Sequence, residues 1–172
     1  MGHPTLLRRA EPVADPCAPD IQALVRDMHD TMEAEGGIGI AAPQIGVSRR
    51  VIMFHVPEIR DGEDGEMDEC AGPLRVLVNP VLTSLSEDQE VDWEGCLSVP
   101  GLRGAVPRYV SVRYTGQTPE GETVDICADG FHARVVQHEF DHLEGVLYPQ
   151  RMTDMRSLVF TAAQDTQEES EL

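Results

Sequence analysis

The segment Gln137-His138-Glu139-Phe140-Asp141-His142 (QHEFDH) decides the fold, because two histidines four residues apart lie together on one face of a helix. The surrounding stretch, FHARVVQHEFDHLEG (131–145), carries apolar residues at helical spacing and is bounded by glycines. Residues four apart lie on one face of a helix, so His138 and His142 can bind a single cation from one side. We therefore predict a helix that carries metal ligands on one face and a core stripe on another.

Glu139 directly follows the first histidine of this pair. In that position a carboxylate lies close enough to take a proton from water on a cation held by the two histidines. Metal-bound water can have a pKa of about 7, so a carboxylate is a suitable base for it. The pattern thus predicts a metal-dependent hydrolase, although an ordinary amphipathic helix with a matching polar face is an alternative.

A second helix is predicted near the N-terminus, in APDIQALVRDMHDTMEAEGG (18–37). Its apolar residues recur at a spacing close to 3.6, with Asp20 as the expected N-cap and a glycine pair at its end. The residues of this apolar stripe are Ile21, Leu24, Val25, Met28 and Met32.

The rest of the chain predicts about six short strands, which mostly follow one another without intervening helices. They include segments 49–56, 74–86, 109–115 and 122–130. The stretch from 91 to 108 is expected to begin as a tight, irregular segment, and 146–152 is expected to be extended. Consecutive strands without βαβ alternation indicate the α+β class, with antiparallel sheets around the ligand-bearing helix and one domain over residues 1–172.

The composition excludes several classes of function. The 172 residues include 31 acidic and 13 basic side chains, for a net charge of −18, which argues against direct nucleic-acid binding. Much of the acid lies in 58–70, an expected loop, and in a tail from about 163 that we expect to be flexible. No apolar run approaches the roughly 20 residues of a membrane span, and no secretory signal is evident, so we expect a cytoplasmic protein.

We expect the third metal ligand upstream of the histidine pair. A further histidine six residues after His142 would be typical of one metalloprotease class, but that position is Tyr148. The only downstream glutamates beyond the helix lie in the acidic tail. Upstream, Cys96 is favoured because a glycine precedes it and a proline soon follows, which suits a fixed, irregular backbone. Cys127 ranks next, although a small core residue is the simpler interpretation of it.

The pattern does not separate these two cysteines from several other upstream donors. They are His3, His29, His55, His132, Cys17, Cys70 and several carboxylates. A cysteine with two histidines would leave the fourth tetrahedral position open for water, as a catalytic zinc-type site requires.

Three segments together resemble the peptide deformylase family. They are GIGIAAPQ (37–44), EGCLS (94–98) and QHEFDH (137–142), and they occur in the family's order with similar spacing. The resemblance covers about residues 11–155. It implies a metal-dependent hydrolase that removes the formyl group from the N-terminal formyl-methionine of newly made polypeptides.

The resemblance also implies roles for individual residues. Cys96, His138 and His142 would bind one divalent metal, with Fe²⁺ expected physiologically and Zn²⁺, Ni²⁺ or Co²⁺ able to occupy the site. Glu139 would act first as general base and then as acid. The side-chain amide of Gln44 and the backbone N–H of Leu97 would stabilise the oxyanion.

A supporting set follows from the same resemblance. Glu94, Arg108 and Asp141 are expected to form a buried charge cluster that orients His138. The substrate peptide and its methionine side chain are expected to contact Ile38, Gly39 and Arg103.

The resemblance also implies a substrate and a cellular setting, and several rival functions are weighed against it. The substrate would be a formyl-methionine nascent peptide, met in transient proximity to the ribosome, while the acidic tail would be repelled by RNA. The rivals are a general His-Glu-x-x-His metallopeptidase, a protein with a closed structural metal site, and a deformylase-like metallohydrolase with different acyl or peptide specificity.

Overall fold

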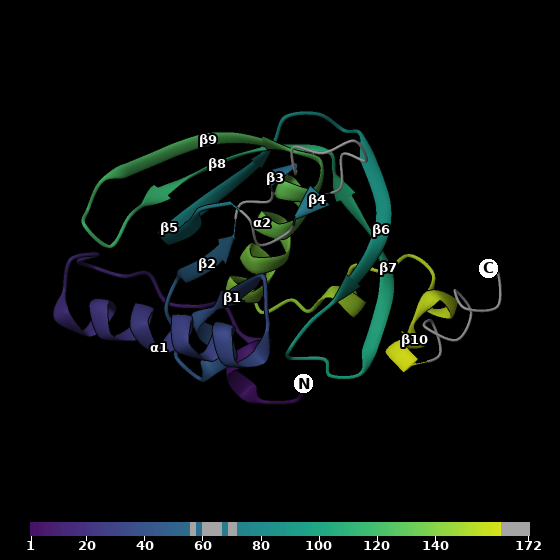
Figure 1. The fold of residues 1–172 in the computed structure, drawn as a ribbon, viewed down its shortest axis with the longest axis horizontal. Coiled ribbons are helices and arrows are strands. Elements are labelled where there is room, and N and C mark those ends of the chain that lie inside the picture. The colour runs from purple at the N-terminus through teal and green to yellow at the C-terminus, as the bar shows by residue number, and fades with distance from the viewer. Residues whose placement is uncertain (56–57, 60–66, 69–71, 163–172) are drawn as a thin grey trace.

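The computed structural model describes residues 1–55, 58–59, 67–68 and 72–162. In this part of the chain, helix α2 lies between a five-stranded sheet and a three-stranded sheet (Figure 1). Helix α1 packs beside the edge of the larger sheet. The predicted α+β class, with antiparallel sheets around the ligand-bearing helix, is confirmed.

Helix α2 (Gly130–Leu143) is the helix predicted from the QHEFDH segment. It begins at Gly130, which has a φ of 55°, and the chain leaves it through Gly145, whose φ is 74°. Its apolar face packs against the large sheet in a core that includes Val136 and Leu143. The opposite face turns His138 toward the small sheet, where it meets Glu94 of that sheet.

Helix α1 (Pro19–Glu35) has the predicted apolar stripe, and Ile21, Leu24, Met28 and Met32 are buried. Gly36 ends it in the left-handed conformation. The N-cap prediction was wrong: Ala18 is the N-cap and makes no side-chain cap bond. Pro19 occupies the first turn, where a missing N–H is tolerated, so Asp20 lies one residue inside the helix.

The larger sheet is wholly antiparallel, in the order β1-β2-β5-β8-β9. Its strands are β1 (Gly39–Ala41), β2 (Val51–His55), β5 (Leu74–Ser84), β8 (Ser111–Gln117) and β9 (Thr123–Asp129). The predicted segment 74–86 is one strand with a register shift between residues 78 and 81. Asn79 lies in that irregularity with a φ of 51°, and its side chain bonds both the N–H and the carbonyl of Val13.

The smaller sheet, in the order β10-β7-β6, was not predicted. It consists of β6 (Gln89–Gly95), β7 (Leu102–Tyr109) and β10 (Val159–Phe160). Strand β6 is polar and mostly exposed, so it lacks the apolar alternation of a half-buried strand. Strand β7 contains Gly104 and Pro107, two residues that normally argue against a strand.

The remaining elements are short. They are 3₁₀ helices η1 (Pro4–Leu7), η2 (Ala42–Ile45), η3 (Tyr148–Gln150) and η4 (Met155–Ser157), and the paired strands β3 (Glu58–Ile59) and β4 (Met67–Asp68). The expected loop 58–70 therefore contains a two-strand pair, and the extended segment 146–152 contains a helical turn. The rest of that loop and the predicted tail from about 163 lie outside the described residues.

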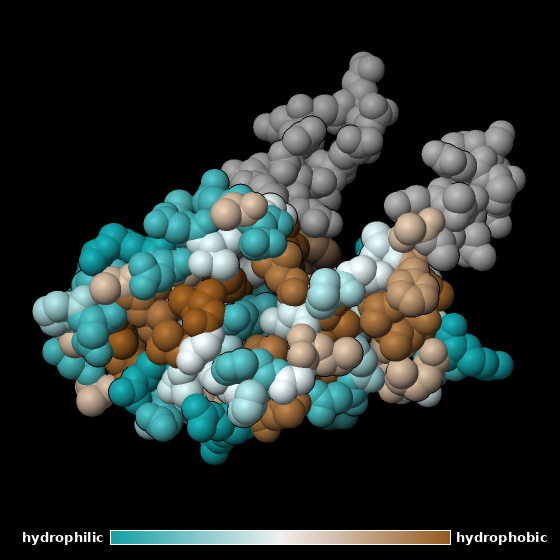
Figure 2. All heavy atoms as spheres, turned by 90° about the horizontal axis from the view of Figure 1, so that it is seen from below, coloured by the Kyte–Doolittle hydropathy of each residue, from teal (hydrophilic) through white to brown (hydrophobic). Residues whose placement is uncertain are grey.

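The described helices include none that is long and apolar enough to cross a membrane. Figure 2 views the molecule from the side that carries α1. The surface there is hollowed between the region around α1 and the region around the small sheet. Apolar residues lie on either side of the hollow, among hydrophilic ones.

Candidate active site

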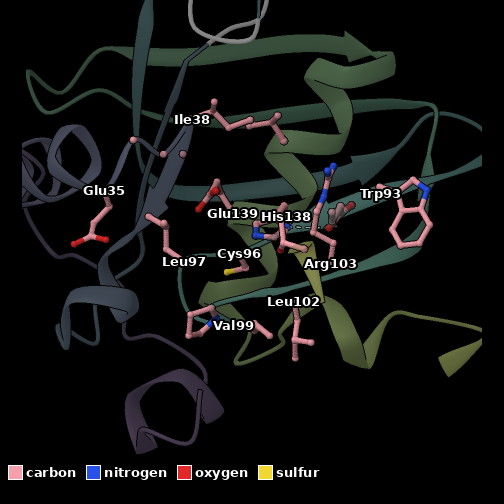
Figure 3. A pocket seen from close by; sticks show the side chains of 18 of the residues that line it. Glu35, Ile38, Trp93, Cys96, Leu97, Val99, Leu102, Arg103, His138 and Glu139 are labelled. Atoms are coloured by element: carbon pink, nitrogen blue, oxygen red, sulfur yellow. Dashed lines mark hydrogen bonds and ion pairs between the residues drawn. The ribbon is translucent and has the colours of Figure 1, made fainter. Parts of the chain in front are cut away.

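The predicted ligands come from two elements that the fold brings together. Cys96 directly follows β6, and His138 and His142 project from one face of α2. One potential ligand atom from each residue lies within 4.8 Å of the others, and the described residues contain no second such group. The Cys96 Sγ is 3.3 Å from His142 Nε2, and Figure 3 shows Cys96 close to His138.

The electrostatics of the Cys96, His138 and His142 group favour the binding of a cation. Burial lowers the pKa of His142 well below its ordinary value, so that side chain is the neutral imidazole that metals bind. Burial also opposes protonation of His138, but hydrogen bonds with Cys96 and Glu94 outweigh it and raise its pKa to about 10. The surroundings of His138 thus stabilise positive charge, and one thiolate with two imidazoles is a donor set suited to a divalent transition metal.

Glu139 lies beside the ligands and is only 4% exposed. Among the described residues, its buried Oε2 has no hydrogen-bond partner. Burial raises the pKa of Glu139 to about 7, against the opposing effect of His138. The backbone at Gly39 approaches this carboxylate so closely that a side chain there would collide with it.

Gln44 lies in η2, and its side chain reaches Cys96. Its Oε1 accepts a hydrogen bond from the N–H of Ala41 at 2.7 Å, which fixes the direction of the amide. Its Nε2 donates to Ser98 Oγ at 3.2 Å and lies 3.7 Å from Cys96 Sγ. The amide nitrogen of Gln44 is therefore held close to the sulfur of Cys96.

Glu94, Arg108 and Asp141 form a buried charge cluster behind the ligands. Arg108 donates from Nε and Nη2 to the two oxygens of Glu94, both at 2.9 Å, and from Nη1 to Asp141 at 2.5 Å. Glu94 Oε2 also lies 2.8 Å from His138 Nδ1. Burial opposes the charge on Glu94, yet the bonds from Arg108 and His138 hold its pKa far below the usual range.

A cleft of about 550 Å³ opens onto this chemistry. Its walls come from the segment after α1, from the β6–β7 connection and from the first turns of α2 (Figure 3). Ile38, Gly39 and Arg103 all line it, and Leu97 is 41% exposed on its rim. The cleft therefore gives an extended ligand access to the Cys96–His138–Glu139 group.

The family model described as polypeptide deformylase matches residues 1–157. The chain belongs to the polypeptide deformylase family. It is 51% identical to peptide deformylase 1 of Nitrosomonas europaea, over 94% of this chain and 89% of that protein. It is 52% identical to peptide deformylase 2 of Ralstonia nicotianae, with the same coverage.

A solved deformylase shares the fold as well. The class I type b peptide deformylase of Acinetobacter baumannii, in a crystal structure bound to Met-Ala-Ser, matches with a TM-score of 0.77 and 37% identity. The match covers 88% of this chain and 94% of that one. As a deformylase, the chain is a metal-binding hydrolase that releases formate from formyl-methionine peptides, and the matches favour this activity over a different acyl or peptide specificity.

The structure brings together one group of predicted residues in this deformylase and separates another from the site. The residues named from the family motifs lie together around the cleft and its charge cluster. By contrast, the alternative ligand Cys127 is exposed on β9, so its interpretation as a small core residue was wrong, and Cys17 is also exposed. On a strand with one solvent-exposed face, a one-residue shift of register exchanges buried and exposed positions, so the strand pattern alone did not fix the burial of Cys127.

One contributor to the deformylase site was missed in the sequence. Arg134 is buried and donates to Glu94 Oε1 at 2.9 Å. A signal for it existed, because a charged residue stands among the apolar residues Ala133, Val135 and Val136, one turn before His138. Its partner could not be identified without knowing that β6 lies against this face of α2.

Proposed function

We propose that Cys96, His138 and His142 hold one divalent metal and that Glu139 is the general base of the deformylation reaction. The observation that carries this proposal is the convergence of the three donors beside a buried carboxylate whose Oε2 has no hydrogen-bond partner in the part of the chain that the structure describes. The thiolate and imidazole donors suit Fe²⁺, the expected physiological ion, and also Zn²⁺, Ni²⁺ or Co²⁺. When bound, such an ion supplies Lewis acidity and makes a water acidic near neutral pH.

In this proposal Glu139 moves the proton. Its Oε2 accepts a proton from the attacking water and later returns it to the amine that leaves as the formyl C–N bond breaks. The carboxylate is fixed by burial against Gly39, and none of the described residues donates a hydrogen bond to its Oε2, so it stays basic. Glu139 thus serves as base in the first half of the reaction and as acid in the second.

Gln44 and Leu97 are proposed to stabilise the oxyanion that forms on the formyl oxygen. The Nε2 of Gln44 is directed toward the ligand group because its Oε1 is held by the Ala41 N–H. The N–H of Leu97 comes from the residue directly after Cys96, in the same connection. A preorganised donor of this kind typically contributes about 3–4 kcal/mol to transition-state stabilisation.

The cleft is proposed to hold the methionine and the peptide that follows it. Ile38 offers an apolar side chain and Gly39 an accessible backbone on one wall, while Arg103 lies on the other. We further propose that the supporting role of Glu94, Arg108 and Asp141 is to orient His138, since Glu94 contacts its Nδ1.

We propose that the enzyme works in the cytoplasm, where newly made chains carry the formyl group. It meets them in transient proximity to the ribosome. With a net charge of −18, long-range repulsion works against direct contact with RNA, so we expect the enzyme to bind no nucleic acid.

An anaerobic assay of formate release from formyl-Met peptides tests this function. The Fe²⁺-loaded protein should release formate, and Glu139→Ala should lose about 10²- to 10⁴-fold in rate while keeping its metal. Absence of formate release by the loaded wild type would refute the proposal. Release of unformylated peptide fragments would instead support a metallopeptidase.

A further inference from the structure

Arg134 links the two parts of the protein that carry the metal ligands. It begins on α2, is only 5% exposed, and reaches across to the β6–β7 hairpin. Its Nη1 donates to the Val106 carbonyl at 2.9 Å, and its Nη2 donates to the Glu90 carbonyl at 2.8 Å. These contacts tie α2, which bears the histidines, to the hairpin in which Cys96 follows β6.

The same guanidinium completes the donor set around Glu94. Oε1 of Glu94 accepts from Arg134 Nη1 and Arg108 Nε, both at 2.9 Å. Oε2 accepts from Arg108 Nη2 and lies 2.8 Å from His138 Nδ1. With two donors on each oxygen, the carboxylate plane is fixed, and Oε2 remains directed at the imidazole.

Arg108 alone does not supply two donors to each oxygen of Glu94. It comes from β7, and it also bonds Asp141. Removal of Arg134 would leave one donor on Oε1, so the carboxylate could rotate about the Arg108 pair. It would also remove the bonds to the hairpin carbonyls, and α2 could then shift relative to Cys96.

We propose that Arg134 is a positioning residue of the metal site, which orients His138 through Glu94 and fixes the separation of the two histidines from Cys96. The inference rests on the proposed metal ligation by Cys96, His138 and His142. Loss of a residue that orients a ligand in this way typically weakens metal binding by about 10- to 100-fold.

The test compares Arg134→Met with Arg50→Met in the full chain. Arg50 is a matched control, because it is also buried and bonds a carboxylate, Glu144, and the Pro80 carbonyl, but contacts neither Glu94 nor a ligand. Zn²⁺ dissociation constants are measured by chelator competition, Co²⁺ absorption spectra report ligand geometry, and urea unfolding of the metal-free proteins reports stability.

Arg134→Met should raise the Zn²⁺ dissociation constant by about 10- to 100-fold and change the Co²⁺ spectrum. Arg50→Met should lower stability and leave both metal readouts as in the wild type. Arg134→Lys, which keeps the charge but not the planar set of donors, should fall between wild type and Arg134→Met, and it remains measurable if the methionine variant does not fold.

A double variant examines the route through Glu94. Glu94→Gln combined with Arg134→Met should weaken Zn²⁺ binding by less than the product of the two single effects. Full multiplicativity, or wild-type Zn²⁺ affinity in Arg134→Met, would overturn the inference. If Cys96→Ser bound Zn²⁺ as tightly as the wild type, the proposed ligand set itself would fail, which is a separate outcome.

Discussion

Gly39 and Glu139 approach each other so closely that a β-carbon at position 39 would lie 2.5 Å from Glu139 Oε1. It would also lie 2.9 Å from the carboxylate carbon, so the conflict involves the whole head group. Strand β1 therefore forms a wall that confines the side chain of the proposed base. The glycine in this motif has a steric role as well as any role in admitting substrate.

Gly39→Ala should displace Glu139 and lower the rate of formate release by about 100-fold, because misplacement of a reacting group by about 1 Å has effects of that size. Metal content should stay at the wild-type level, since none of the three ligands is touched. Gly95→Ala is the comparison: its β-carbon would meet Arg103 Cγ at 3.7 Å, an ordinary contact, and should reduce the rate far less. Equal losses in the two variants would contradict the steric explanation.

The variant Gln44→Glu tests the donor end of the Gln44 amide separately from its acceptor end. The carboxylate can still accept from the Ala41 N–H, but it replaces the proposed oxyanion donor by an acceptor. We expect kcat to fall by about 10²- to 10³-fold, with wild-type metal content and little change in thermal stability. Steady-state kinetics with a formyl-Met peptide, together with metal analysis, measures this. An unchanged kcat would remove Gln44 from the proposed oxyanion site.

The helices and the ligand pair could be predicted because local periodicity determines them. In α2 the apolar stripe and the pair His138–His142 follow the same 3.6-residue repeat, so one assumption accounts for both. Helix α1 was equally evident from its stripe. Its start was misplaced by two residues because a proline replaced the expected capping side chain.

The partners that meet across the fold could not be predicted in this way. Spacing alone left Cys96 and Cys127 as competing third ligands, and the decision depends on which strand ends beside α2. The β6–β7 hairpin escaped detection because its outer strand is polar and its inner strand contains glycine and proline. The partner of Arg134 lies on that hairpin, so it was missed for the same reason.

Arg108→Met should destabilise the metal-free protein by about 3 kcal/mol, the lower end of the range for breaking a buried ion pair. It removes the cation that Glu94 and Asp141 share, but Glu94 keeps Arg134 and Asp141 keeps Arg151. Urea unfolding monitored by circular dichroism measures this change. Arg113→Met is the control, since Arg113 pairs with Asp125 on the exposed face of β8 and β9, and its loss should have little effect. Comparable midpoints for the two variants would contradict the buried-cluster interpretation, as would wild-type metal content and activity in Arg108→Met.

His132 should make the stability of the fold depend on pH. Its half-buried ring packs against Phe54 and Tyr114, and burial, aided by Arg75 and opposed by Asp129, lowers its pKa below the ordinary 6.5. The unfolded chain therefore takes up a proton near pH 6.5 while the folded protein does not, so stability is complete above that pH and falls as the pH decreases toward the folded pKa. His132→Phe keeps an aromatic ring but cannot titrate. In urea unfolding between pH 7.5 and about 5, the difference in unfolding free energy between wild type and His132→Phe should shift in favour of the variant as the pH falls below about 6.5. A difference that stays constant over this range would show that His132 does not contribute to the acid sensitivity.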